Sequence, residues 1–161
     1  MSHPAAGPPR LIADAMLGSL ARWLRTLGID VAYERGIEDA DLVAAAVAED
    51  RIILTRDRRL VERRLARNHL LIRSPDVEDQ VRQVLAELAI ELDVARLFSR
   101  CLRCNEPLVS VPAEEARQQV PPFVAATQDR FRRCPTCGRI YWRSTHVERM
   151  RERLRRMGVA E

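Results

Sequence analysis

All four cysteines of this 161-residue chain lie in its C-terminal part. They form two C-x-x-C pairs, Cys101 with Cys104 and Cys134 with Cys137, with 29 residues between the pairs. Four thiolates on two tight turns can surround one Zn²⁺ ion tetrahedrally, and Gly138 permits the positive φ that such turns often need. Two disulfides are disfavoured in a reducing cytosol, and a redox pair explains only one C-x-x-C. The spacing therefore predicts a zinc ribbon with a structural ion, because four ligands leave no position for water.

Apolar runs and helical leucine repeats alternate through the N-terminal part. Strands are expected at 10–14, 31–33, 51–55 and 70–72, and helices at about 17–27, 39–47, 60–65 and 77–92, with Leu65 on the third helix. This order predicts an α/β fold with a compact, mostly parallel sheet and helices on both faces. In such sheets, functional sites form just beyond the carboxyl ends of the strands.

Acidic residues follow these strands. Asp14 comes after the first strand and Asp57 after the third, while Asp39 and Asp41 open the helix after the second. A parallel sheet would bring them to one edge, where their repulsion is relieved by a cation. Mg²⁺ and Mn²⁺ suit carboxylate oxygens and can activate water for phosphate displacement. Thr55 could orient a metal-bound water, or it could be an ordinary strand residue.

Each acid also has a purely structural interpretation. Asp39 and Asp41 complement the dipole of the helix that they begin. Asp14 and Asp57 could cap the helices that follow them, and Asp76 is better explained as a helix cap than as a metal ligand.

Charge is divided unevenly along the chain. Residues 1–97 carry 14 Arg against 16 acidic residues, a net charge of −2, while residues 98–161 carry 13 Arg against 7, a net charge of +6. This asymmetry favours a polyanion-binding C-terminal part, although a solvated surface is the alternative. Residues 1–9 have the composition of a flexible tail without a signal peptide, and no apolar run is long enough for a membrane span, so we expect a cytoplasmic protein without a membrane partner.

Four residues are candidates for nucleic-acid contact. Trp23 between Arg22 and Arg25 could stack on a base while the arginines bind phosphates, or it could cover a packing seam. His146 lies at the start of the last expected helix, 147–157, where Thr145 and Glu148 form a capping-box pattern. The arginines of that helix could also bind phosphates, or they could form an ordinary solvated face.

Three segments carry a resemblance to a known family. They are DAMLGSLARWLR at 14–25, IILTRD at 52–57 and CPTCGRIYW at 134–142, followed by STH and ERM at 144–150. The chain resembles the Mut-seven C-terminal RNase domain family, a PIN-like group of ribonucleases. The resemblance implies a three-layer, PIN-like nuclease domain at 10–97 and a zinc ribbon with a basic helix at 98–161. It also implies that Asp14 and Asp57 bind the catalytic metal, with Asp39 or Asp41 as the middle acid.

The residues and the resemblance together predict a metal-dependent, endonucleolytic ribonuclease that uses Mg²⁺ or Mn²⁺, with a zinc ribbon that helps to hold RNA. One alternative is a non-catalytic RNA-binding or ribosome-associated module. Another is a toxin-like ribonuclease.

Overall fold

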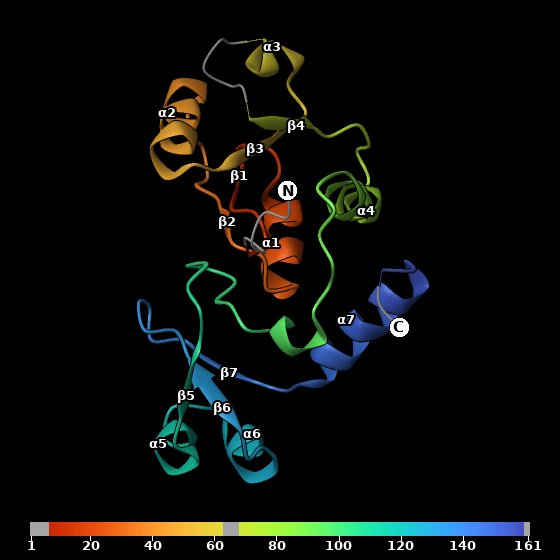
Figure 1. The fold of residues 1–161 in the computed structure, drawn as a ribbon. Coiled ribbons are helices and arrows are strands. Elements are labelled where there is room, and N and C mark those ends of the chain that lie inside the picture. The colour runs from red at the N-terminus through yellow and green to blue at the C-terminus, as the bar shows by residue number, and fades with distance from the viewer. Residues whose placement is uncertain (1–6, 63–67, 160–161) are drawn as a thin grey trace. The chain divides into compact units, whose positions relative to one another are not determined.

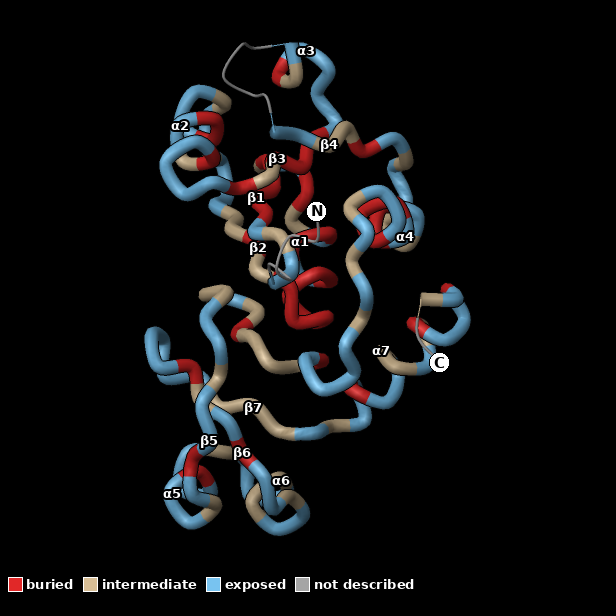
Figure 2. Tube along the Cα trace, viewed as in Figure 1, coloured by how far each residue is buried: buried red, intermediate tan, exposed pale blue. Residues whose placement is uncertain are grey.

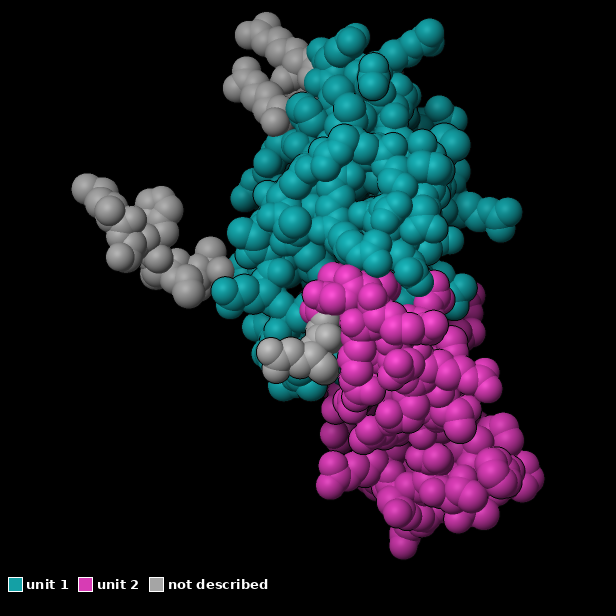
Figure 3. Space-filling view, turned by 90° about the vertical axis from the view of Figure 1, so that its right-hand side faces the viewer, with its two compact units in different colours: residues 1–97 teal, residues 98–161 magenta. Residues whose placement is uncertain are grey.

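The computed structural model describes residues 7–62 and 68–159. Within it the chain forms two compact units, residues 1–97 and 98–161, which are coloured separately in Figure 3. Each unit has its own sheet, and each is described below by itself.

Strands and helices alternate along unit 1 (Figure 1). Its elements are β1 (Leu11–Ala13), α1 (Gly18–Thr26), β2 (Val31–Ala32), α2 (Asp39–Glu49), β3 (Ile52–Thr55), α3 (Arg58–Val61), β4 (His69–Leu71), α4 (Val77–Glu87) and the 3-10 helix η1 (Val94–Arg96).

The four strands of unit 1 form one parallel sheet in the order β2-β1-β3-β4. Because side chains alternate across a strand, Ile12 and its partner Ile53 share one face, where they pack against buried residues of α2 and of α3. Helices α1 and α4 contact each other and lie on the other face (Figure 1). The predicted α/β class, with a parallel sheet covered by helices on both faces, is confirmed.

The predicted element bounds need three corrections. Helix α4 ends at Glu87 rather than near residue 92, because Ala89 adopts a left-handed φ of 50° and the Ile90 N–H bonds back to the Leu85 carbonyl. The helix expected at 60–65 is the short α3, and Leu65 lies outside the described residues. The fourth strand begins at His69, one residue earlier than expected, and ends before Ile72.

Unit 2 is built around a three-stranded antiparallel sheet in the order β5-β6-β7. Its elements are β5 (Val109–Val111), α5 (Ala113–Arg117), α6 (Pro122–Thr127), β6 (Phe131–Arg133), β7 (Ile140–Trp142) and α7 (Thr145–Arg156). Helices α5 and α6, which the sequence analysis did not predict, supply Ala116 and Val124 to a small core with Val111, Phe131 and Trp142. Figure 2 shows how few buried residues this unit has.

The start of α7 also differs from expectation. Its N-cap is Ser144, which makes no side-chain capping bond, so the capping box of Thr145 and Glu148 is wrong. Glu148 instead accepts a hydrogen bond from Arg143 Nε at 2.9 Å.

Candidate functional site

Asp14 and Thr55 meet at the carboxyl ends of β1 and β3. The strands are paired through Ala13 and Leu54, and the Asp14 N–H continues the ladder by donating to the Leu54 carbonyl at 3.0 Å. The Thr55 hydroxyl lies 2.5 Å from Asp14 Oδ2, and the Met16 N–H donates to Asp14 Oδ1 at 2.9 Å. Asp14 is 7% exposed and Thr55 is fully buried, so the carboxylate is held in one orientation.

This meeting point is also the topological switch point of the sheet. Strand β1 lies between β2 and β3, and the chain reaches these two neighbours through α1 on one face and α2 on the other. Parallel sheets leave a crevice where consecutive connections diverge in this way, at the carboxyl ends of the strands. The fold therefore places Asp14 and Thr55 where α/β proteins bind ligands.

Asp57 is linked to this pair through the threonine. The Asp57 N–H donates to Thr55 Oγ1 at 3.0 Å, so the hydroxyl accepts from Asp57 and directs its own proton to Asp14. The exposed Asp57 carboxylate accepts from the Arg59 N–H at 2.8 Å and caps α3. The helix-cap interpretation is thus observed for Asp57, whose backbone is linked to Asp14 through the Thr55 hydroxyl.

The acids after the second strand are not brought into a cluster. Asp39 and Asp41 lie in the first turn of α2, the first half-buried and the second exposed. Within 7–62 and 68–159, only the cysteines form a group of three or more potential ligands with all ligand atoms within 4.8 Å. Asp76 caps α4 by accepting from the N–H groups of Glu78 and Asp79, as predicted.

The sequence analysis missed Tyr33, which supports the loop that carries Asp14. The Tyr33 hydroxyl donates to the Ala15 carbonyl at 2.9 Å. A Cβ on Gly18 would lie only 2.9 Å from the Tyr33 hydroxyl oxygen, so glycine leaves room for this side chain. Tyr33 follows β2 directly, as Asp14 follows β1, and that shared position was the available signal.

The four cysteine sulfurs of unit 2 form a tight cluster, with all four ligand atoms within 4.8 Å of one another. Two sulfurs bound to one tetrahedral zinc at about 2.3 Å lie about 3.8 Å apart. Cys101 Sγ and Cys137 Sγ are 3.8 Å apart, a distance that fits this geometry and is far longer than a disulfide bond. In each knuckle the N–H of the second cysteine donates to the sulfur of the first, Cys104 to Cys101 at 3.4 Å and Cys137 to Cys134 at 3.5 Å. The cluster could hold a structural metal such as zinc.

Tyr141 on β7 is a second residue that the sequence analysis did not assign to a site. Its oxygen accepts from the Leu102 N–H at 3.1 Å and lies 3.1 Å from Cys101 Sγ. When Cys101 is a thiolate, it has no proton to give, so the Tyr141 hydroxyl is then the donor in this contact. Burial raises the pKa of Cys101, but hydrogen bonds from Tyr141 and from the backbone together lower it by more than burial raises it, to about 7. These hydrogen bonds favour the thiolate form of Cys101, which is the form that binds a metal ion.

The predicted nucleic-acid contacts divide into exposed and buried residues. Arg22 and His146 are exposed, whereas Trp23 is 7% exposed and Arg25 is 5% exposed. Arg25 Nε donates to the Val31 carbonyl at 3.0 Å. Burial of Trp23 agrees with the packing-seam interpretation rather than with base stacking, and we do not carry Trp23 or Arg25 forward as RNA contacts.

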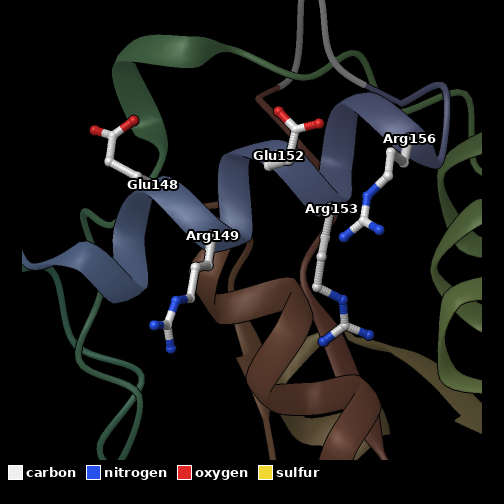
Figure 4. Close-up of a pocket in the computed structure, with 5 residues that line it drawn as sticks. All are labelled: Glu148, Arg149, Glu152, Arg153 and Arg156. Atoms are coloured by element: carbon white, nitrogen blue, oxygen red, sulfur yellow. The ribbon is translucent and has the colours of Figure 1, made fainter.

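Helix α7 carries basic and acidic residues on different sides. In Figure 4, Arg149 and Arg153 extend from one side of the helix, and Glu148 and Glu152 extend from the other. Together with Arg156 they line an open hollow of about 440 Å³.

Fold and sites together define the class of the protein. It is an α/β domain with a polar site at the switch point of a parallel sheet, followed in the same chain by a unit with four clustered thiols that could hold a metal ion. The family model that matches residues 9–154 is the Mut7-C RNAse domain, so the chain belongs to this family. Membership indicates a ribonuclease-like function with RNA as substrate, and it confirms the resemblance seen in the sequence.

No curated protein and no solved structure matches the chain. Across the described residues, none of the helices has the length and apolar character required to cross a membrane.

Proposed function

We propose that this chain is a metal-dependent ribonuclease that hydrolyses phosphodiester bonds within RNA, with its active site at the carboxyl ends of β1 and β3. The observation that carries the proposal is the hydroxyl of Thr55, which joins the buried Asp14 carboxylate to the backbone of Asp57. Membership of the Mut7-C RNAse family supports the reaction type.

The donor atoms fit a hard divalent cation. Asp14 and Asp57 supply carboxylate oxygens, the preferred ligands of Mg²⁺ and Mn²⁺, and Mg²⁺ is commonly held by only one or two carboxylates. A bound ion of this kind activates water and neutralises charge on the reacting phosphate. Thr55 holds Asp14 in position by its hydrogen bond. Either Asp39 or Asp41, in the first turn of α2, is proposed as the middle acid, which would approach the ion only when it binds.

The two units would have separate roles. Residues 10–97 form the PIN-like nuclease domain, and residues 98–161 form a zinc ribbon whose small core makes the metal a main source of folding energy. Reduced thiols are required to hold zinc, which suits the cytoplasm. The net charge of +6 in residues 98–161, together with the exposed His146, supports a role of the ribbon in RNA binding. In unit 1, the exposed Arg22 is also proposed as an RNA contact.

The test is cleavage of an internally labelled single-stranded RNA with and without added Mn²⁺, with no chelator present so that zinc stays on the cysteines. Asp14→Asn and Asp57→Asn should each abolish cleavage, because Asn keeps the shape but removes the charge. Thr55→Val should lower activity about 10- to 100-fold, as expected for the loss of a partner that orients a metal ligand. Asp76→Asn is the matched control: it changes an acid that follows β4 and caps α4, and it should leave cleavage unchanged.

A metal-binding measurement complements the kinetics. At ten times its Kd, Mn²⁺ should stabilise the parent by about 1.4 kcal/mol and should not stabilise Asp14→Asn. Full activity of both Asn variants would place the active site elsewhere.

A non-catalytic RNA-binding module is the second candidate. Two observations favour this candidate. Asp57 caps α3, and among the described residues neither Asp39 nor Asp41 belongs to a group of three potential metal ligands. This candidate predicts RNA binding without cleavage and without stabilisation by Mn²⁺.

A further inference from the structure

Three arginines flank Asp57 in sequence: Arg56 precedes α3, and Arg58 and Arg59 are its first two residues. Residues 56–59 are called the β3–α3 turn below. Arg56, Arg58 and Arg59 are all exposed, and Figure 2 shows this turn in the colour of exposed residues. Their guanidinium groups make no hydrogen bond or ion pair in the described part of the chain. The Asp57 carboxylate is engaged by a backbone N–H, so the local acid does not explain the arginines.

The other described arginines of unit 1 are used in several ways: Arg22 and Arg35 are exposed, and Arg25 donates to a backbone carbonyl. Five of them pair with acids: Arg10 and Arg51 with Asp30, Arg73 with Glu87, Arg82 with Asp79, and Arg96 with Asp93. This pattern is expected in a unit whose acidic residues outnumber its arginines. The β3–α3 turn departs from this pairing of arginines with acids, because three arginines flank a single acid there.

The position of the turn indicates what these cations can bind. Arg56 directly follows Thr55, whose hydroxyl contacts Asp14, so the basic turn begins at the carboxyl edge of the sheet where the acids lie. Guanidinium groups donate paired hydrogen bonds to phosphate oxygens, and contacts of this kind set the register of a nucleic-acid strand without reading its bases.

We propose that Arg56, Arg58 and Arg59 form a phosphate-binding surface that holds single-stranded RNA beside Asp14 and Asp57. The identity of the polyanion as RNA rests on the proposed function, whereas the surface itself rests on the three exposed guanidinium groups, which have no partner among residues 7–62 and 68–159. The surface lies in unit 1, so substrate binding does not depend on the basic C-terminal part alone.

The experiment compares RNA binding by the full-length parent and by the triple variant Arg56→Gln, Arg58→Gln, Arg59→Gln over a series of salt concentrations. Labelled single-stranded RNA is used in buffer without Mg²⁺ or Mn²⁺ and without a chelator, so that no cleavage takes place and zinc stays on the cysteines. Each phosphate contact contributes about 0.7 to the slope of log K against log salt for single strands, so the slope should flatten by about 2. At 0.1 M salt the same relation gives an affinity about 100-fold weaker.

A matched triple variant, Arg10→Gln, Arg82→Gln, Arg96→Gln, removes the same charge from ion-paired arginines of the same unit. It should keep the parent slope, and thermal unfolding should show that both triple variants fold. An unchanged slope in the Arg56, Arg58 and Arg59 variant, or equal flattening in both variants, would overturn the proposal.

These outcomes are separate from those of the proposed hydrolysis. If the parent never cleaves RNA with Mn²⁺ but the slope flattens as expected, the binding surface stands and the catalytic proposal fails. If the parent cleaves RNA and the slope is unchanged, the catalytic proposal stands and this surface fails.

Discussion

Arg51 should be one of the most costly residues to replace in unit 1. Its guanidinium is 7% exposed and donates to the Leu11 carbonyl at 2.9 Å and to Asp30 Oδ1 at 2.6 Å, and Glu49 lies 3.5 Å from Arg51 Nε. Arg51→Met keeps the apolar stem but removes these donors. A hydrogen bond to a charged partner contributes about 1.5–3 kcal/mol and a neutral one about 1 kcal/mol. Asp30 keeps its contact with Arg10, so we expect a total loss of about 2–4 kcal/mol.

Urea denaturation followed by circular dichroism measures this loss, with the m-value showing whether the unfolded state has changed. For a unit of this size, a loss of about 3 kcal/mol lowers the thermal midpoint by roughly 12–24 °C. Arg10→Met is the matched control, because Arg10 is 49% exposed and its ion pairs should contribute less than about 1 kcal/mol. Equal losses from Arg51→Met and Arg10→Met would refute the reasoning that burial makes the Arg51 interactions costly to lose.

Three further predictions concern the metal cluster and the fold. Purified under reducing conditions, the chain should contain about one zinc per molecule by elemental analysis. Cys134→Ser should loosen unit 2 while unit 1 keeps its circular dichroism signal. Acidification should release the zinc, because protons compete for the thiolates. Tyr141→Phe should weaken zinc affinity about 10- to 100-fold in competition with a chromogenic chelator, because Cys101 loses its phenol donor, and an unchanged affinity would count against that role. Gly28→Ala should destabilise unit 1 by about 2–4 kcal/mol, because φ at Gly28 is +83° and the new Cβ would lie 2.3 Å from the Arg96 carbonyl oxygen. Gly36→Ala is the control: its φ is +78° but a Cβ there meets no atom within 4 Å, so the same urea titration should show a loss of only about 1–2 kcal/mol.

The parts of the fold that were predictable from sequence are those set by short-range periodicity. Leu20, Leu24 and Leu27 recur at helical spacing and are all buried, and Ile53 and Leu54 lie in a strand covered on both faces. The helices α5 and α6 were not predictable in this way. Each is at most six residues long, and their apolar residues become a core only when β5 and β6 pair beneath them.

The candidate site was predictable only in outline. Strand-end position identified Asp14 and Thr55, because parallel strands carry their carboxyl ends to one edge. The direction of the Thr55 hydrogen bond and the support from Tyr33 depend on contacts between residues that are distant in sequence. For Trp23, local sequence was misleading. Its neighbours Arg22 and Arg25 suggested an exposed aromatic side chain, but its position around the axis of α1 buries it.

Electrostatics connects the acidic pair to its basic flank. Two carboxylates at a strand edge repel a phosphate, and at an effective dielectric constant of 20 each pair of charges 4 Å apart interacts by about 4 kcal/mol. A site that keeps Asp14 and Asp57 ionised must therefore bring compensating positive charge to the same edge before RNA can approach. A divalent cation on the two carboxylates can neutralise the local charge, and the guanidinium groups of Arg56, Arg58 and Arg59 can attract the phosphates on either side of the scissile one. The arginines act without a divalent cation, so RNA should bind this surface without added Mg²⁺ or Mn²⁺, and addition of Mn²⁺ should tighten binding to the parent more than to Asp14→Asn.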